Sequence, residues 1–112
     1  HDVVLEIDWQ GAQQIKQKMP EVVTIFILPP NLSTLRNRLM QRNQDSAESM
    51  EMRLAEAKNE FAHFGEYDYL IVNDNFEHAL VDLKAIIMSS RLRCEQQRHN
   101  LRGLLRELCG VE

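Results

Sequence analysis

The sequence predicts an α/β fold in which short parallel strands alternate with helices. Three segments are almost uninterrupted runs of apolar and β-branched residues: 2–8 (DVVLEID), 22–28 (VVTIFIL) and 67–72 (YDYLIV). Runs without polar alternation are typical of strands covered on both faces. The intervening segments repeat apolar residues every three to four positions, as helices do. The resulting order is strand, helix, strand, two helices, strand, helix, which predicts βαβ units with right-handed crossovers.

Each helix has its own boundary signals. The first, over 11–18, stops before Pro20, because proline cannot continue a helix interior. The second can be capped by Asn31 or Ser33 and is expected to end near Arg42.

The next helix follows a polar stretch. Asp45 with Glu48 three residues later resembles a capping pair, and the helix is expected to fail at Gly65. Asp74 or Asn75 can cap a further helix after the third strand.

Composition excludes several classes of protein. The 112 residues carry 13 basic and 17 acidic side chains, and 44% are hydrophobic, as in a globular domain. The net charge of −4 argues against a nucleic-acid binder, and no apolar run reaches the roughly 18 residues of a membrane span. The cysteines Cys94 and Cys109 lack ligand spacing, and no signal peptide opens the chain, so we expect a reduced cytoplasmic protein.

The tail differs from the rest of the chain. Residues 91–112 hold five arginines against three glutamates, and leucines form a helical stripe at 101, 104, 105 and 108. Such a stripe could bind a membrane or a partner helix. Packing on its own domain or on a second copy is the more common use, and we expect that.

An acidic pair ends the first expected strand. Glu6 and Asp8 are two residues apart and therefore share one face of a strand. Carboxylates at the carboxyl edge of a parallel strand can face a ligand or hold a hydrated Mg²⁺. Alternatively, Asp8 caps the following helix and Glu6 pairs with a nearby base.

Three arginines surround the second expected turn. Arg38 and Arg42 lie four residues apart on one helix, and Arg53 lies on the next. Guanidinium groups suit phosphate oxygens, so an arginine-tipped helical hairpin fits a phosphate-transfer lid. The alternative is a solvated face paired with neighbouring acids. Those acids are Asp45, Glu48, Glu51 and Glu56.

The end of the third strand offers one further candidate. Asn73 carries a donor and an acceptor that can read a purine base, although Asn73-Asp74 can equally be a capping pair. We expect His63 and Trp9 to be packing residues.

Four segments together resemble the C-terminal half of bacterial guanylate kinases, which are P-loop nucleoside monophosphate kinases. They are 2–18 with D-W-Q-G, 25–30 (IFILPP), 35–54 with R-L-x-x-R, and 66–74 with Y-x-Y-L-I-V-N-D. The match runs in order over residues 2 to about 93. It implies a partial P-loop kinase fold within one domain: three parallel strands, flanking helices, a helical lid over about 32–64 and a long C-terminal helix over about 75–109.

The resemblance also implies an activity and residue roles. The family transfers the γ-phosphate of ATP to GMP, with Mg²⁺, to give ADP and GDP. By resemblance, Arg42 and Arg53 are the catalytic arginines that grip the phosphates, and Arg38 and Asn73 contact ATP on its adenine side. Glu6 and Asp8 face GMP, and Asp8 meets the metal through water. The family often has Asp where this chain has Glu6.

The sequence departs from the family in one large respect, because it contains no G-x-x-x-x-G-K-[ST] phosphate loop. We therefore expect the chain alone to be inactive, and to associate through its C-terminal helix or an exposed sheet edge. Two alternatives stay open: a non-catalytic guanylate kinase-like interaction module, and a same-fold kinase acting on a phosphorylated sugar. Such modules tend to lose the arginines and acids retained here, which favours the enzyme.

Overall fold

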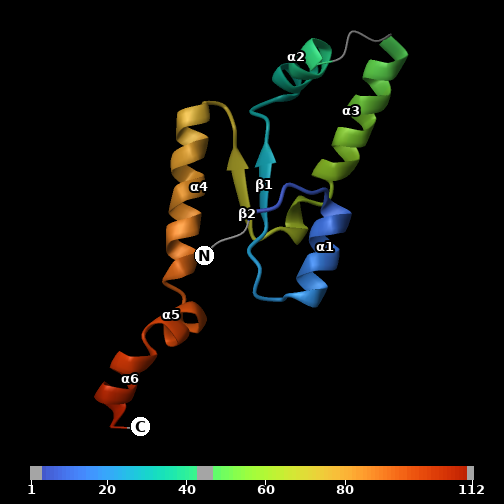
Figure 1. Cartoon of the computed structure of the whole chain (residues 1–112). Helices are drawn as coiled ribbons and strands as arrows, with labels where there is room; N and C mark the ends of the chain where they lie inside the picture. The colour runs from blue at the N-terminus through green and yellow to red at the C-terminus, as the bar shows by residue number, and fades with distance from the viewer. Residues whose placement is uncertain (1–3, 43–46, 111–112) are drawn as a thin grey trace. The chain divides into compact units, whose positions relative to one another are not determined.

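The computed structural model describes residues 4–42 and 47–110, and the chain divides into two compact units (Figure 1). The first unit, His1–Asp74, contains α1 (Trp9–Lys18), β1 (Ile25–Leu28), α2 (Leu32–Arg42), α3 (Ala47–Phe61), the 3₁₀ turn η1 (Phe64–Glu66) and β2 (Tyr69–Val72). The second unit, Asn75–Glu112, contains α4 (Phe76–Arg91), α5 (Cys94–Asn100) and α6 (Arg102–Cys109).

The sheet confirms two of the three predicted strands and their direction. β1 and β2 are parallel neighbours, with Ile25 opposite Tyr69 and Leu28 opposite Val72. The Asn73 N–H extends the ladder by donating to the Leu28 carbonyl at 2.7 Å. Parallel pairing requires a crossover between the strands, and α2 and α3 form it.

The predicted strand over residues 2–8 is wrong for its described part. Residues 4–8 belong to no strand, and residues 2 and 3 lie outside the described residues. Val4 and Leu5 are 77% and 60% exposed. A strand exists only where its N–H and C=O groups meet a neighbouring strand. Within the described residues, β1 and β2 pair only with each other, so residues 4–8 do not join the sheet.

Side-chain caps explain where α1 and α2 begin. The Asp8 side chain accepts a hydrogen bond from the Gly11 N–H at 2.8 Å and caps α1. Of the two candidates for α2, Asn31 acts as the cap, since its side-chain oxygen accepts from the Thr34 N–H at 2.7 Å. The expected cap Asp45 lies outside the described residues.

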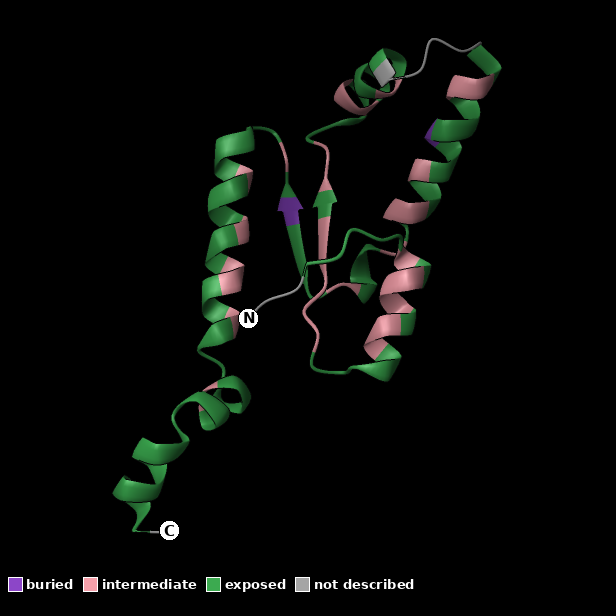
Figure 2. Cartoon of the chain, viewed as in Figure 1, coloured by how far each residue is buried: buried purple, intermediate pink, exposed green. Residues whose placement is uncertain are grey.

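Aromatic contacts join the sheet to the helical hairpin. The Phe26 ring on β1 stacks on Tyr67, with centroids 4.6 Å apart, and meets Phe61 at 5.9 Å. Within the described chain only Leu54 and Ile71 are buried, each 3% exposed (Figure 2). The aromatic cluster therefore fixes the end of α3 on β1, while much apolar surface stays uncovered.

The second unit corrects the expected long C-terminal helix. Asn75, one of the two candidates, caps α4 by accepting from the backbone of Glu77 and His78. α4 ends at its C-cap Leu92, so the region over 75–109 contains three helices instead of the one expected. The Ser90 hydroxyl donates to the Ile87 carbonyl at 2.9 Å and competes with helical backbone bonding near this end.

The leucine stripe of the tail stays exposed. The leucines at 101, 104, 105 and 108 are 37% to 70% accessible in the described chain. Packing of this stripe on a second copy therefore remains a prediction. No described helix combines the length and apolarity needed to cross a bilayer.

Candidate functional site

Asp8 is built into the start of α1. One carboxylate oxygen, Oδ1, caps the helix, as the alternative interpretation of this residue predicted. A Cβ atom at Gly11 would lie 3.2 Å from that oxygen, so glycine at this position allows the carboxylate to approach closely. Among the described residues no hydrogen bond engages the second oxygen, Oδ2. Asp8 can therefore cap its helix and still present an oxygen to a ligand.

Glu6 lies on the extended segment before α1 and is exposed. The base expected in the alternative interpretation is not seen, because no hydrogen bond or ion pair to Glu6 occurs in the described parts of the chain. The carboxylate is thus available for a ligand, although nothing in its surroundings fixes its direction.

Arg38 and Asn73 are brought together at the carboxyl end of the sheet. The Arg38 guanidinium donates from Nη2 to the Asn73 carbonyl oxygen at 3.1 Å, across 35 residues of sequence. Both residues line an open groove of about 320 Å³ with Pro29, Leu35 and other side chains. The Asn73 carbonyl accepts from only one of the guanidinium nitrogens, and the Asn73 side chain takes no part in this bond. The Arg38 guanidinium and the Asn73 side-chain amide can therefore both contact a ligand in the groove.

The two catalytic candidates are placed to different extents. Arg53 lies on α3 with its side chain exposed. Within residues 4–42 and 47–110 it forms no ion pair with Glu48, Glu51 or Glu56, and Asp45, the other acid of that alternative, lies outside the described residues. Arg42 is the last residue of α2, and its side chain lies outside the described residues.

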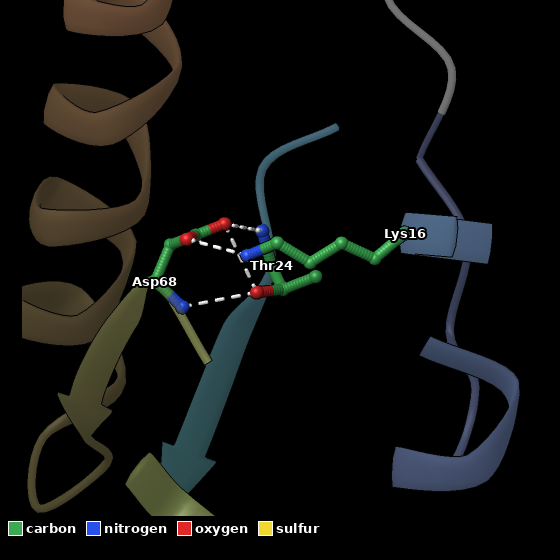
Figure 3. A network of polar contacts seen from close by, with 3 residues as sticks. All are labelled: Lys16, Thr24 and Asp68. Carbon is green, nitrogen blue, oxygen red and sulfur yellow. Dashed lines mark hydrogen bonds and ion pairs between the residues drawn. The ribbon is translucent and has the colours of Figure 1, made fainter. Parts of the chain in front are cut away.

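A compact polar network lies at the opposite end of the sheet. Asp68, directly before β2, accepts from the backbone and hydroxyl of Thr24 at 2.9 and 3.1 Å. Its other oxygen receives the Lys16 ammonium at 2.7 Å, and Figure 3 shows that side chain reaching across from α1. Burial alone would raise the pKa of Asp68, but the hydrogen bonds from Lys16 and Thr24 outweigh it and lower the pKa. We call these three residues the Asp68 network.

A second set of contacts joins α1 to the end of α3. Trp9 stacks on His63, with ring centroids 3.5 Å apart and planes 15° from parallel. Glu66 binds the His63 ring nitrogen Nδ1 and accepts from the Gln13 amide. Trp9 and His63 are therefore packing residues, as expected, but they pack on each other. We call Trp9, Gln13, His63 and Glu66 the clasp.

Tyr67 lies near enough to Asp8 for the carboxylate charge to act on its hydroxyl group. Burial raises the pKa of Tyr67, and the negative charges of Glu60, Asp8 and Glu66 raise it further. The hydroxyl is therefore protonated at neutral pH.

The acids fit a loosely held magnesium ion. No group of three or more Asp, Glu, His or Cys side chains is arranged around a metal position in the described residues. Mg²⁺ needs no such cage, because it keeps several waters and commonly binds one or two carboxylates together with substrate phosphates. The available Oδ2 of Asp8 fits a contact through water.

Comparison with known proteins identifies the family. A family model described as Guanylate kinase matches residues 1–90. The chain belongs to the guanylate kinase family. It is 52% identical over 110 residues to the guanylate kinase of Pseudomonas fluorescens strain Pf0-1, covering 98% of this chain and 53% of that protein. The chain is also 51% identical over 109 residues to the guanylate kinase of Alkalilimnicola ehrlichii, covering 97% of this chain and 54% of that protein.

A solved guanylate kinase supports the fold. The crystal structure from Anaplasma phagocytophilum matches with a TM-score of 0.72 and 33% identity, over 95% of this chain and 49% of that one. The predicted partial α/β kinase fold is thus confirmed. The chain spans about half the length of the curated relatives it matches.

Sequence reasoning did not find the Asp68 network or the clasp. The contacts that join α1, Thr24 and the segment after α3 span 44 to 54 residues, so no local pattern predicts them. One signal was present: the segments 2–18 and 66–74, which carry the family resemblance, contain Trp9, Gln13, Glu66 and Asp68.

Proposed function

We propose that this chain supplies the ATP-side groove, the phosphate-gripping arginines and the GMP-side acids of an enzyme that transfers the γ-phosphate of ATP to GMP. The observation that carries the proposal is the bond between Arg38 and the Asn73 carbonyl. The family resemblance assigns these two residues, which lie 35 positions apart in sequence, to the adenine side of ATP, and both line one groove.

The groove suits a planar base. A guanidinium plane stacks well on aromatic rings, and an amide offers a donor and an acceptor to a base edge. Arg38 would therefore cover the adenine while the Asn73 side chain meets its polar edge. The neighbouring Pro29 and Leu35 supply apolar contact.

Phosphoryl transfer needs positioning and neutralisation of charge more than a dedicated base. Arg53, exposed and without an ion pair among the described residues, is free to bind moving phosphate oxygens bidentately. Arg42, by its place in the R-L-x-x-R motif, is proposed for the same role.

The acids would act on the acceptor side. Asp8 holds its backbone position through the α1 cap and presents Oδ2, while Glu6 adds a second acceptor of N–H groups from GMP. When bound with ATP, Mg²⁺ supplies charge neutralisation at the phosphates, and Asp8 would contact its water shell.

A coupled assay of ADP release tests the proposal in two parts. The 112-residue chain alone should show no GMP-dependent turnover, because its sequence has no phosphate loop. The complete enzyme, with the segment that precedes this chain in its relatives, should show clear GMP-dependent turnover. Turnover by the chain alone, or none by the complete enzyme, would contradict the proposal.

Substrate comparison separates the alternatives. A phosphorylated sugar that replaces GMP in the same assay would favour the related kinase. Binding of protein partners without turnover would favour the interaction module.

A further inference from the structure

The clasp lies where α3 ends. Phe61 closes the helix on the Phe26 ring, and two residues later His63 stacks on Trp9 of α1. Glu66 then bridges the imidazole and the Gln13 amide. One ring stack and one carboxylate thus join residues that lie more than 50 positions apart in sequence.

The joined elements carry different parts of the proposed site. α1 begins at the Asp8 cap, one residue before Trp9. α3 carries Arg53 eight residues before its end at Phe61. The helical rise places Arg53 about 12 Å along the axis from that end.

We propose that His63 and Glu66 are positioning residues, which hold the end of α3 on α1 through Trp9 and Gln13 and so set where Arg53 lies relative to Asp8. This inference rests on the proposed function, because it assigns Arg53 and Asp8 to one reaction.

A lever argument gives the size of the effect. A tilt of α3 by about 10° at its base would displace Arg53 by about 2 Å, given the rise of the helix. Misplacement of a catalytic group by about 1 Å can slow a reaction by about 10²-fold. Loss of the clasp should therefore lower kcat while the groove that holds ATP keeps its own contacts.

The variants separate stacking from general stability. In the complete enzyme, His63→Ala removes both the stack and the contact with Glu66, and we expect kcat to fall about tenfold or more. KM for ATP should change less than about threefold, because Arg38 and Asn73 are untouched. His63→Phe keeps a ring on Trp9 and should recover most of the lost kcat. His78→Ala removes an exposed histidine on α4 and serves as the control.

Trp9 supplies a direct readout, because it is the single tryptophan of the chain. In the 112-residue chain, His63→Ala should shift Trp9 emission to longer wavelength and raise its quenching by acrylamide, and His63→Phe should reverse both changes. Hydrogen exchange at the C-terminal end of α3 should quicken in His63→Ala and Glu66→Ala, but not in His78→Ala.

Three results would overturn the inference. They are unchanged Trp9 emission in His63→Ala, altered emission with unchanged kcat, and a loss of kcat that follows thermal destabilisation and is not recovered by His63→Phe. Absence of turnover in the unaltered complete enzyme would contradict the proposed function instead. The clasp would then be judged by hydrogen exchange, where unchanged protection of α3 in His63→Ala overturns it.

Discussion

The two ends of the β1–β2 sheet are built in different ways. At the amino end, the Asp68 carboxylate accepts hydrogen bonds from the Lys16 ammonium and from the backbone N–H and hydroxyl of Thr24. At the carboxyl end, Arg38 makes one hydrogen bond to the Asn73 backbone, and its side chain stays exposed.

The difference separates structural polar groups from available ones. Polar side chains at the amino end satisfy each other and fix α1 on the strands. Those at the carboxyl end keep donors and acceptors free, as ligand-binding edges of parallel sheets do.

Arg53→Ala in the complete enzyme should give the largest effect. We expect kcat to fall by about 10³-fold, the size of effect known for arginines that neutralise phosphoryl-transfer charge. The free energy of unfolding should change little, because Arg53 makes no ion pair in the described chain. Steady-state kinetics with GMP measure kcat, and thermal unfolding measures the change in stability. Arg42→Ala should lower kcat to a similar extent.

Two companion variants sharpen this test. Arg53→Lys keeps the charge but loses the planar fork, and should recover only part of the rate. Lys58→Ala removes an exposed cation from the same helix and should leave kcat unchanged. Normal turnover in both Arg42→Ala and Arg53→Ala would refute their role.

Asp68→Ala should give the largest change in stability. Loss of its hydrogen bonds and ion pair should lower the free energy of unfolding of the complete enzyme by roughly 1–2 kcal/mol, a modest value because the group is partly exposed. Urea unfolding at pH 7 measures it. Asp82→Ala, an exposed acid on α4, is the control and should change stability little.

The pH dependence of that variant has a definite sign. Folding lowers the pKa of Asp68 from its ordinary value of 3.8, so the stabilisation by its carboxylate is present above pH 3.8 and is lost as the pH falls through the lower folded pKa. The stability difference between the unaltered enzyme and Asp68→Ala should therefore narrow below pH 3.8. A difference that grows on acidification would contradict the network.

Arg38→Ala should weaken ATP binding without unfolding the chain. We expect KM for ATP to rise about tenfold, equivalent to about 1.4 kcal/mol, with KM for GMP nearly constant. Arg36→Ala removes another exposed arginine of α2 and should leave both constants unchanged. Equal effects of the two substitutions would show that general charge, not the groove, binds ATP.

Asn31→Ala should give the smallest effect. Loss of the α2 cap should cost about 1 kcal/mol of the free energy of unfolding, measured by urea. Asn59→Ala, an exposed position inside α3, should be neutral or slightly stabilising, since alanine is the better helix former. If Asn59→Ala destabilises the protein as much as Asn31→Ala does, the Asn31 cap does not stabilise α2.

Much of the fold followed from local pattern. The uninterrupted runs before Pro29 and Asn73 gave two parallel strands, and Asn31 and Asn75 were each one of two named caps. The segment over 2–8 failed as a strand because pairing depends on a neighbour, not on the segment itself. The helix expected over 75–109 is interrupted at Leu92, the C-cap of α4, and the apolar spacing of the sequence does not show that interruption.

Site residues could be predicted from the sequence only where they lie in motifs of the family resemblance. The resemblance joined Arg38 to Asn73, and the structure places them in contact through the Asn73 backbone. The roles of Glu6, Asp8, Arg42 and Arg53 stay predictions, as do the cytoplasmic location and self-association. The clasp depends on tertiary contacts across more than 50 residues, which no periodicity reports.

Hydrogen exchange of the complete enzyme, with and without an unreactive ATP analogue and GMP, tests the central division most directly. We predict that ligands slow exchange in peptides covering α2 and Asn73, while peptides covering Thr24 and Asp68 keep the same rates in both states. Protection confined to the amino end of the sheet, or equal at both ends, would contradict the assignment of the carboxyl end to nucleotide binding.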